Sequence, residues 1–240
     1  MPTEPMEITH KHTGECYADK ARNYANVVDS RPWNAHFERP AVVSLLPSLA
    51  DTSVLDVGCG SGWYAEYLIN HRASVTAFDF NAEFVELTRA RVGDQAKVLQ
   101  ADLAEPLNFA QNEAYDLVVC PLVMHYLKEW EPTLREFHRV LKPKGILVFS
   151  THHPFIDWKY FKREDYFATE LLEDEWEIGK MKFYRRPLTA MSEALDSTGF
   201  WIERLLEPQP IEAFRQANTE RYEHHLKTPL FLVVRAGKKH

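Results

Sequence analysis

The sequence predicts a doubly wound α/β fold, in which helices cover both faces of a mostly parallel sheet. From Val54 to Ser150, short and almost wholly apolar runs alternate with helical stretches, and a glycine-rich turn follows the first run. Apolar strands separated by helices are typical of a parallel sheet that is buried on both faces. A chain of 240 residues, 45% of them hydrophobic, is long enough for one such core with a small cap.

Five strands are expected in the alternating region, at residues 54–57, 74–78, 97–100, 117–120 and 146–150. Between them, residues 64–70 are expected to be helical, and Asn81 is a suitable N-cap for the next helix. Residues 130–141 show the spacing of an amphipathic helix, which the run from Lys142 to Gly145 should end.

The segments on either side of this region lack its regular alternation of strands and helices. A helix is expected at 41–49 and another at 189–198, and two closing strands are expected at 200–206 and 230–234. Residues 154–187 are aromatic and charged without a clean period, which favours a cap insertion over the carboxyl edge of the sheet. Residues 9–37 carry further aromatic side chains. We therefore expect an N-terminal lid segment over 1–39, followed by one domain over 40–240 that includes the cap.

Composition excludes several classes of protein. A formal net charge of −7 argues against bulk binding to nucleic acid, which depends on basic side chains that neutralise phosphates. The first ten residues are polar, and no apolar run approaches the length of a membrane helix. Cys16, Cys59 and Cys120 have no spacing typical of disulfides or zinc sites. A cytoplasmic protein without membrane insertion is therefore expected.

The turn after the first strand reads Gly58-Cys59-Gly60-Ser61-Gly62-Trp63. Glycines at this point bring bare backbone against a ligand at the carboxyl edge of the sheet. The dinucleotide fingerprint requires a small residue where Trp63 stands, and no Gly-Lys-Ser/Thr sequence of a phosphate loop is present. The turn therefore favours a nucleoside without a pyrophosphate.

Acidic residues stand in or at the end of three strands. Asp56 precedes the turn, Asp79 ends the second strand, and Asp102 ends the third. A carboxylate at position 79 can accept hydrogen bonds from both ribose hydroxyls, and Asp102 suits the amine of an adenine between Phe80 and Leu103. Each carboxylate alone is more often a turn or capping residue, but the three together indicate a nucleoside site.

These residues resemble the class I methyltransferases that use S-adenosylmethionine (SAM), in particular the broad small-molecule group with the ubiquinone/menaquinone-type enzymes. The resemblance covers about residues 40–150 and implies SAM as cofactor, with S-adenosyl-L-homocysteine as product. It implies that Asp56 and the turn 58–62 hold the methionine portion of SAM. Cys59 belongs to this turn, but its thiol is assigned no chemistry. Ribose would contact Asp79, adenine would contact Asp102, and three further residues would line or close the site: Pro121, Leu122 and Tyr24.

Methyl transfer needs a general base only if the acceptor must lose a proton. His125 follows the fourth strand and could be a base or a positioning residue, although a histidine packed beneath the lid is equally compatible. His152 and His153 follow the fifth strand and could contact the acceptor. Together with Asp157 they could instead bind a metal, but adjacent histidines point in different directions, so no metal is expected.

The acceptor is expected to be a small molecule. Tyr184, Arg185 and Arg186 would suit an anionic group on it, since guanidinium groups bind carboxylates and phosphates bidentately. Glu207, at the same edge, would face the pocket. Methylation of tRNA or protein remains an alternative because the insertion holds several basic residues, and so does a SAM-binding protein that uses another part of SAM. The acceptor, the oligomeric state and the pathway do not follow from the sequence.

Overall fold

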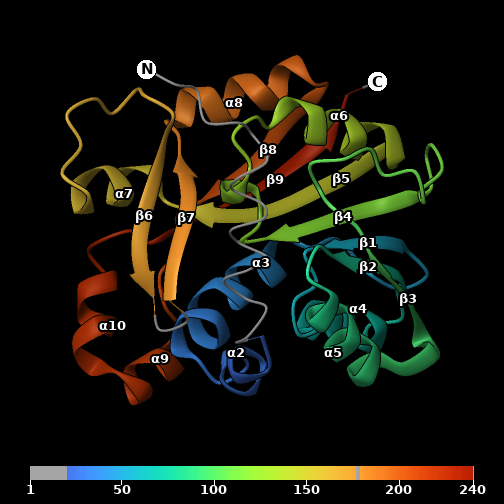
Figure 1. Cartoon of the computed structure of the whole chain (residues 1–240), viewed down its shortest axis with the longest axis horizontal. Coiled ribbons are helices and arrows are strands. Elements are labelled where there is room, and N and C mark those ends of the chain that lie inside the picture. Colours follow the sequence, from blue (N-terminus) through green and yellow to red (C-terminus); the bar gives the residue numbers. More distant parts are fainter. Residues whose placement is uncertain (1–20, 177–178, 240) are drawn as a thin grey trace.

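Seven strands form one sheet in the computed structural model, which describes residues 21–176 and 179–239 (Figure 1). Across the sheet their order is β3-β2-β1-β4-β5-β9-β8. The first five strands in sequence are parallel, whereas β9 runs antiparallel to both of its neighbours. The predicted doubly wound fold with an antiparallel closing pair is therefore confirmed. The strands are β1 (Ser53–Val57), β2 (Ser74–Asp79), β3 (Ala96–Gln100), β4 (Tyr115–Pro121), β5 (Leu141–His152), β8 (Phe200–Leu206) and β9 (Phe231–Lys238).

Helices cover both faces of this sheet (Figure 1). Along β4, Val118 and Cys120 belong to one hydrophobic cluster and Leu117 and Val119 to the other. Because both faces of the strand are covered, every position in this run is apolar, and the sequence shows no alternation. The first cluster packs against α6 (Glu131–Val140) and α8 (Leu188–Ser197), and the second against α3 (Arg39–Leu45), α4 (Trp63–Asn70) and α5 (Ala82–Val92).

Helix ends follow from local chemistry. The Asn81 side chain accepts hydrogen bonds from the backbone N–H groups of Glu83 and Phe84, so it caps α5 as expected. The helix expected at 41–49 ends earlier, at Leu45, because Leu46 is extended. Leu46 precedes Pro47, and the proline ring disfavours the helical conformation of the residue before it.

The insertion contains regular structure that the sequence analysis did not predict. It begins with α7 (Pro154–Tyr160) and continues into an antiparallel hairpin of β6 (Glu170–Trp176) and β7 (Gly179–Arg185). The hairpin lies across the carboxyl ends of β4 and β5 (Figure 1). Strand β7 packs against the short helix η3 (Met124–Tyr126), which follows β4. Helix α7 and the hairpin therefore form a wall at the carboxyl edge of the sheet.

Further helices gather beside this edge. They include α2 (Ala21–Val28) and the π-helix η1 (Asn34–Glu38) before the sheet, and α9 (Glu212–Ala217) and α10 (Thr219–His225) between β8 and β9. A third small cluster of Phe37, Phe214 and Phe231 joins η1, α9 and β9. The expected lid over 9–37 falls partly on residues 1–20, outside the described residues. In the described part of the chain, no helix has the length and apolarity needed to span a membrane.

Candidate functional site

The glycine-rich turn joins β1 to α4 at the carboxyl edge of the sheet, and its glycines serve different purposes. Gly60 has a positive φ of 55°, and a Cβ added there would meet no atom within 4 Å. A Cβ at Gly62 would meet Thr88 at 3.1 Å, and one at Gly58 would meet Val123 at 2.3 Å. Close packing of the protein therefore requires Gly58 and Gly62, whereas Gly60 leaves an open cradle that faces the cavity.

Two carboxylates stand beside this turn. Asp79 accepts a hydrogen bond from Gly60 N through Oδ2 (3.0 Å) and one from Asn81 N through Oδ1 (2.9 Å). Burial raises the pKa of Asp79 to about 6. Asp102 accepts a hydrogen bond from Ala104 N at 2.8 Å. Both carboxylates line the cavity, and each oxygen that accepts one backbone bond still has a lone pair for a ligand.

Asp56 lies beneath the turn rather than in the cavity. It has no exposed surface. Burial, with a smaller effect from the charge on Asp79, raises the pKa of Asp56 to about 7, although the backbone N–H of Ala65 acts in the opposite direction. Asp56 is therefore buried in β1 and, unlike the other two carboxylates, does not line the cavity.

A cavity of about 220 Å³ opens at this edge of the sheet. It brings together most residues that the sequence predicted for the cofactor, and two of the predicted histidines. Gly62 and Asp56 do not line it. The predicted residues on its wall are Tyr24, Gly58, Cys59, Gly60, Asp79, Phe80, Asp102, Leu103, Pro121, Leu122, His125 and His152.

The cavity is closed on one side by residues that sequence reasoning missed. Glu38 is only 1% exposed, and its carboxylate accepts hydrogen bonds from the hydroxyls of Tyr64 (2.9 Å) and Ser150 (2.5 Å). Burial raises the pKa of Glu38. The guanidinium carbon of Arg39 lies 4.4 Å from the centroid of the Trp63 ring. Local sequence contains no signal for this arrangement, because η1 and α4 meet only in the folded chain.

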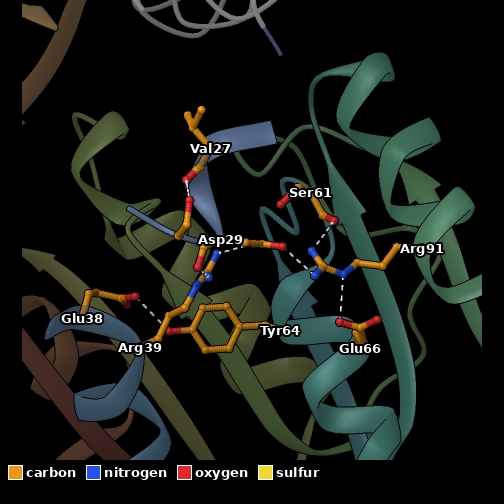
Figure 2. A network of polar contacts seen from close by, with 9 residues as sticks. Val27, Asp29, Glu38, Arg39, Ser61, Tyr64, Glu66 and Arg91 are labelled. Atoms are coloured by element: carbon orange, nitrogen blue, oxygen red, sulfur yellow. Dashed lines mark hydrogen bonds and ion pairs between the residues drawn. The ribbon is translucent and has the colours of Figure 1, made fainter. Parts of the chain in front are cut away.

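A polar network fastens the N-terminal segment to the glycine-rich turn (Figure 2). One oxygen of Asp29 accepts from Arg39 at 3.0 Å, and the other accepts from Arg91 at 2.6 Å. Arg91, on α5, also donates to the carbonyl oxygen of Ser61 (3.2 Å) and to Glu66 (2.9 Å). Asp29 therefore links the segment before the sheet to the loop that forms the cavity wall.

The opposite side of the cavity is aromatic. The rings of His125 and His152 stack, with centroids 4.3 Å apart and planes at 16°. The ring of Trp176, from β6, lies 5.6 Å from the ring of His152, and all three residues line the cavity. Burial lowers the pKa of His152 to about 4 and lowers the pKa of His125 well below its ordinary value. Both imidazoles are therefore neutral at pH 7.

The remaining predicted acceptor residues lie outside this cavity. His153 pairs with Glu207 (Nε2–Oε1, 2.7 Å), whose side chain is 58% exposed. Tyr184 is half-buried on β7 and is not among the lining residues. His152 and His153 therefore face different surroundings. In residues 21–176 and 179–239, no group of three or more histidine, cysteine or acidic side chains is placed to hold a metal ion.

The two arginines of the insertion differ from the expectation of an anion-binding pair. Arg185 donates to the carbonyl oxygens of Tyr166 and Asp165 and to the carboxylate of Glu170. Arg186 donates to the carbonyl oxygens of Leu127 and Lys128, and its guanidinium carbon lies 4.3 Å from the centroid of the Trp130 ring. Both guanidinium groups are buried, and their terminal nitrogens donate to these local acceptors, whereas Nε of each arginine has no hydrogen-bond partner among the described residues. Neither arginine lines the cavity.

Residues 55–149 match the family model of the methyltransferase domain. A malonyl-[acyl-carrier protein] O-methyltransferase from Enterobacter lignolyticus is 34% identical over 113 residues, which cover 46% of this chain and 43% of that protein. The chain spans about half the length of several curated relatives that it matches.

Solved structures extend the similarity to the whole fold. An S-adenosylmethionine dependent methyltransferase from Mesorhizobium loti is 25% identical with a TM-score of 0.71, over 88% of this chain and 100% of that one. A Listeria monocytogenes protein assigned to the same class has a TM-score of 0.75 at 21% identity, over 85% of this chain and 97% of that one. The chain therefore shares its overall fold with these solved structures.

Proposed function

We propose that the chain transfers the methyl group of SAM to a small-molecule acceptor, because residues 55–149 match the model of a methyltransferase domain and the fold is similar to that of a SAM-dependent methyltransferase. The transfer is an in-line displacement that releases S-adenosylhomocysteine. The observation that carries this proposal is the open backbone cradle at Gly60 beside Asp79 and Asp102, on one wall of a cavity with a second, aromatic wall.

The described residues fit the parts of SAM. The open space at Gly60 lets a ligand approach the backbone, so the turn with Asp56 beneath it would hold the methionine portion. The free lone pairs of Asp79 suit the ribose hydroxyls, and Asp102 suits the adenine amine between the apolar faces of Phe80 and Leu103. Pro121 and Leu122 would border the sulfonium, and Tyr24 would close the site. When bound, SAM supplies an electrophilic methyl group.

The chain's own residues would position the acceptor and exclude water. The side of the cavity near η3 is formed by His125, Tyr126 and Leu127, with His152 and Trp176 from β5 and β6. His125 is 2% exposed, and neither of its ring nitrogens has a partner among the described residues. A neutral imidazole in this place can accept the proton that an acceptor loses when its nucleophilic atom is methylated.

Two observations favour a small molecule over RNA. The acceptor side is a cavity rather than an open face. Several basic side chains of the insertion are also paired with acids of the same hairpin: Arg163 and Arg185 with Glu170, and Lys180 with Glu173. Paired charges offer less attraction to phosphates.

The proposal also includes three expectations from the sequence: a cytoplasmic location, a lid over residues 1–39 and a cap over residues 154–187.

The test is calorimetric titration with S-adenosylhomocysteine. Asp79→Ala removes the hydrogen bonds to ribose and should weaken binding by roughly 1.5–3 kcal/mol. Asp116→Asn is the matched control, because Asp116 binds Ser53 N and Lys142 near the start of β4, away from the ligand edge. It should leave the affinity unchanged. Equal affinity in Asp79→Ala and the parent would refute the ribose site, and a product assay with labelled SAM separates methyl transfer from use of another part of SAM.

A further inference from the structure

The aromatic wall of the cavity contains a polar group that the protein itself leaves unused. His125 is almost fully buried, yet neither Nδ1 nor Nε2 has a hydrogen-bond partner among the described residues. Buried polar groups are nearly always paired, so an unpaired imidazole on a cavity wall indicates a ligand group. Its ring plane is fixed by stacking on His152 and by the nearby Tyr126 ring, 4.3 Å away.

Flat rings surround this imidazole. Phe183 meets the edge of His152 at 4.8 Å between centroids and lies 6.0 Å from Trp176. The indole N–H of Trp176 donates to Asp174 within the same strand, so the indole is held by its polar edge. This leaves stacking faces, rather than charged groups, on the side of the cavity away from the glycine-rich turn.

The charged side chains near this wall already have partners within the protein. Asp157 lies 3.9 Å from Nδ1 of His152, and burial raises the pKa of Asp157 to about 7. The Arg186 guanidinium is held by carbonyl oxygens, and Arg185 is held by Glu170. Among the described residues that line the cavity, the only arginine or lysine is Arg39, which is paired with Asp29. A carboxylate on the acceptor would therefore lose its hydration without gaining a basic side chain.

From this geometry, and resting on the proposed methyl transfer, we propose that the acceptor is an uncharged, flat ring compound with a weakly acidic O–H or N–H. Its ring stacks against Trp176 and His152, and its acidic hydrogen bonds to a ring nitrogen of His125.

The chemistry balances with these groups alone. A lone pair on the acceptor oxygen or nitrogen forms the new bond to the methyl carbon, and the bond from carbon to sulfur breaks with its electron pair on sulfur. The sulfonium becomes a neutral thioether. Methylation of a neutral atom makes its attached proton strongly acidic, so a weakly basic imidazole suffices to take it. His125 carries that proton until solvent removes it.

The experiment uses the full chain saturated with S-adenosylhomocysteine and three probes: 2-naphthol, 2-methoxynaphthalene and 2-naphthoate. Calorimetry or ligand-observed NMR should show 2-naphthol binding at least about tenfold more tightly than 2-naphthoate, because the carboxylate finds no basic partner. The methoxy compound lacks the hydrogen-bond donor and should bind about fivefold more weakly than 2-naphthol.

Variants assign the effect to the wall. Trp176→Ala should weaken 2-naphthol binding about tenfold while S-adenosylhomocysteine binding stays within about twofold. Trp176→Phe keeps a stacking ring and should retain most of the affinity, which covers the case in which the alanine variant disturbs the hairpin. His125→Phe keeps a ring but no nitrogen, so it should abolish the preference for 2-naphthol over its methoxy derivative. Trp201→Ala, at a tryptophan 52% exposed on β8, is the control and should change neither ligand.

The binding results distinguish a failure of this inference from a failure of the proposed function. If the parent binds 2-naphthoate as tightly as 2-naphthol, or binds none of the three probes although S-adenosylhomocysteine binds, the inference is wrong. Unchanged 2-naphthol affinity in both Trp176 variants and His125→Phe also overturns it. If S-adenosylhomocysteine itself does not bind, the proposed function fails instead, and this result is recognised before any probe is added.

Discussion

The carboxylate of Asp29 should contribute more to the stability of the fold than its partly exposed position suggests. Replacing it with alanine removes the acceptor of Arg39, whose side chain is 6% exposed, and one acceptor of Arg91, whose side chain is 23% exposed (Figure 2). Among the described residues, Arg39 would keep its long bond to the Asp29 carbonyl oxygen (3.4 Å), its contact with Trp63 and the attraction of the nearby Glu38 carboxyl group. A buried guanidinium would then lack its ion-pair partner.

The magnitude follows from burial. A hydrogen bond to a charged group contributes about 1.5–3 kcal/mol when buried, which applies to the Arg39 side of the network. The Asp29 side chain is 38% exposed, so solvent screens both bonds, and we take the lower part of this range for Arg39. For Arg91, whose side chain is 23% exposed, we count less than about 1 kcal/mol. Asp29→Ala should thus lower the free energy of unfolding by about 2–3 kcal/mol, which for a chain of this size lowers Tm by roughly 4–10 °C.

Urea denaturation at pH 7 measures this difference, and Glu66→Gln is the matched control. Glu66 is the other carboxylate partner of Arg91, but its side chain is 42% exposed, and it makes no contact with Arg39. The control should therefore lose less than about 0.5 kcal/mol. Asp29→Ala should also weaken S-adenosylhomocysteine binding, since Arg91 holds the carbonyl of Ser61 in the turn. Equal destabilisation by both variants, or none by Asp29→Ala, would refute the reasoning.

Three further changes have defined outcomes. Because burial raises the pKa of Asp56 from 3.8 to about 7, its contribution to stability is complete below about pH 4 and is lost as pH rises through 7. The stability of Asp56→Asn relative to the parent should therefore be greater at pH 8 than at pH 5 by about 2.5 kcal/mol, and a pH-independent difference in denaturation experiments would contradict this. Gly60→Ala and Gly93→Ala place a side chain at φ values of 55° and 57° with open space around it, so both should lower Tm, but only Gly60→Ala should weaken S-adenosylhomocysteine binding in calorimetry. Arg185→Ala should lower the free energy of unfolding, measured in urea, by about 3 kcal/mol. Arg163→Ala removes a 46% exposed partner of the same Glu170 and should lower it by less than about 1 kcal/mol. Similar losses in the two variants would show that burial does not determine the strength of these ion pairs.

The core of the fold was predictable because its signals are local. An apolar strand, a glycine turn and a carboxylate at a strand end lie within a few residues of one another, and the parallel sheet brings the strand ends to one edge. The sequence analysis therefore identified Asp79 and Asp102 among the residues that line the cavity. It also expected the antiparallel closing pair.

Residues that depend on distant partners were not predictable in the same way. Glu38 and Arg39 receive their roles from Ser150, Tyr64 and Asp29, and no local pattern marks those contacts. The hairpin did carry a signal that was overlooked: alternate residues of β7 are buried, but one of them is an arginine, so the apolar pattern is interrupted. Arg185 was read as a ligand contact because sequence does not show which charges the fold satisfies internally.

The position of β9 in the sheet bears on how the protein acquires its structure. Strand β9 lies between β5 and β8, although it follows both in the sequence. Among the described strands, β8 pairs only with β9, so residues 200–206 have no place in the sheet until 231–238 have been synthesised. Until then β5 presents an unpaired edge, which is a site for association between nascent chains. Because these pairings are far apart in sequence, they also form slowly. The sheet is therefore completed when β9 pairs with β5 and brings β8 to the new edge, and a chaperone that shields the β5 edge would act before this step.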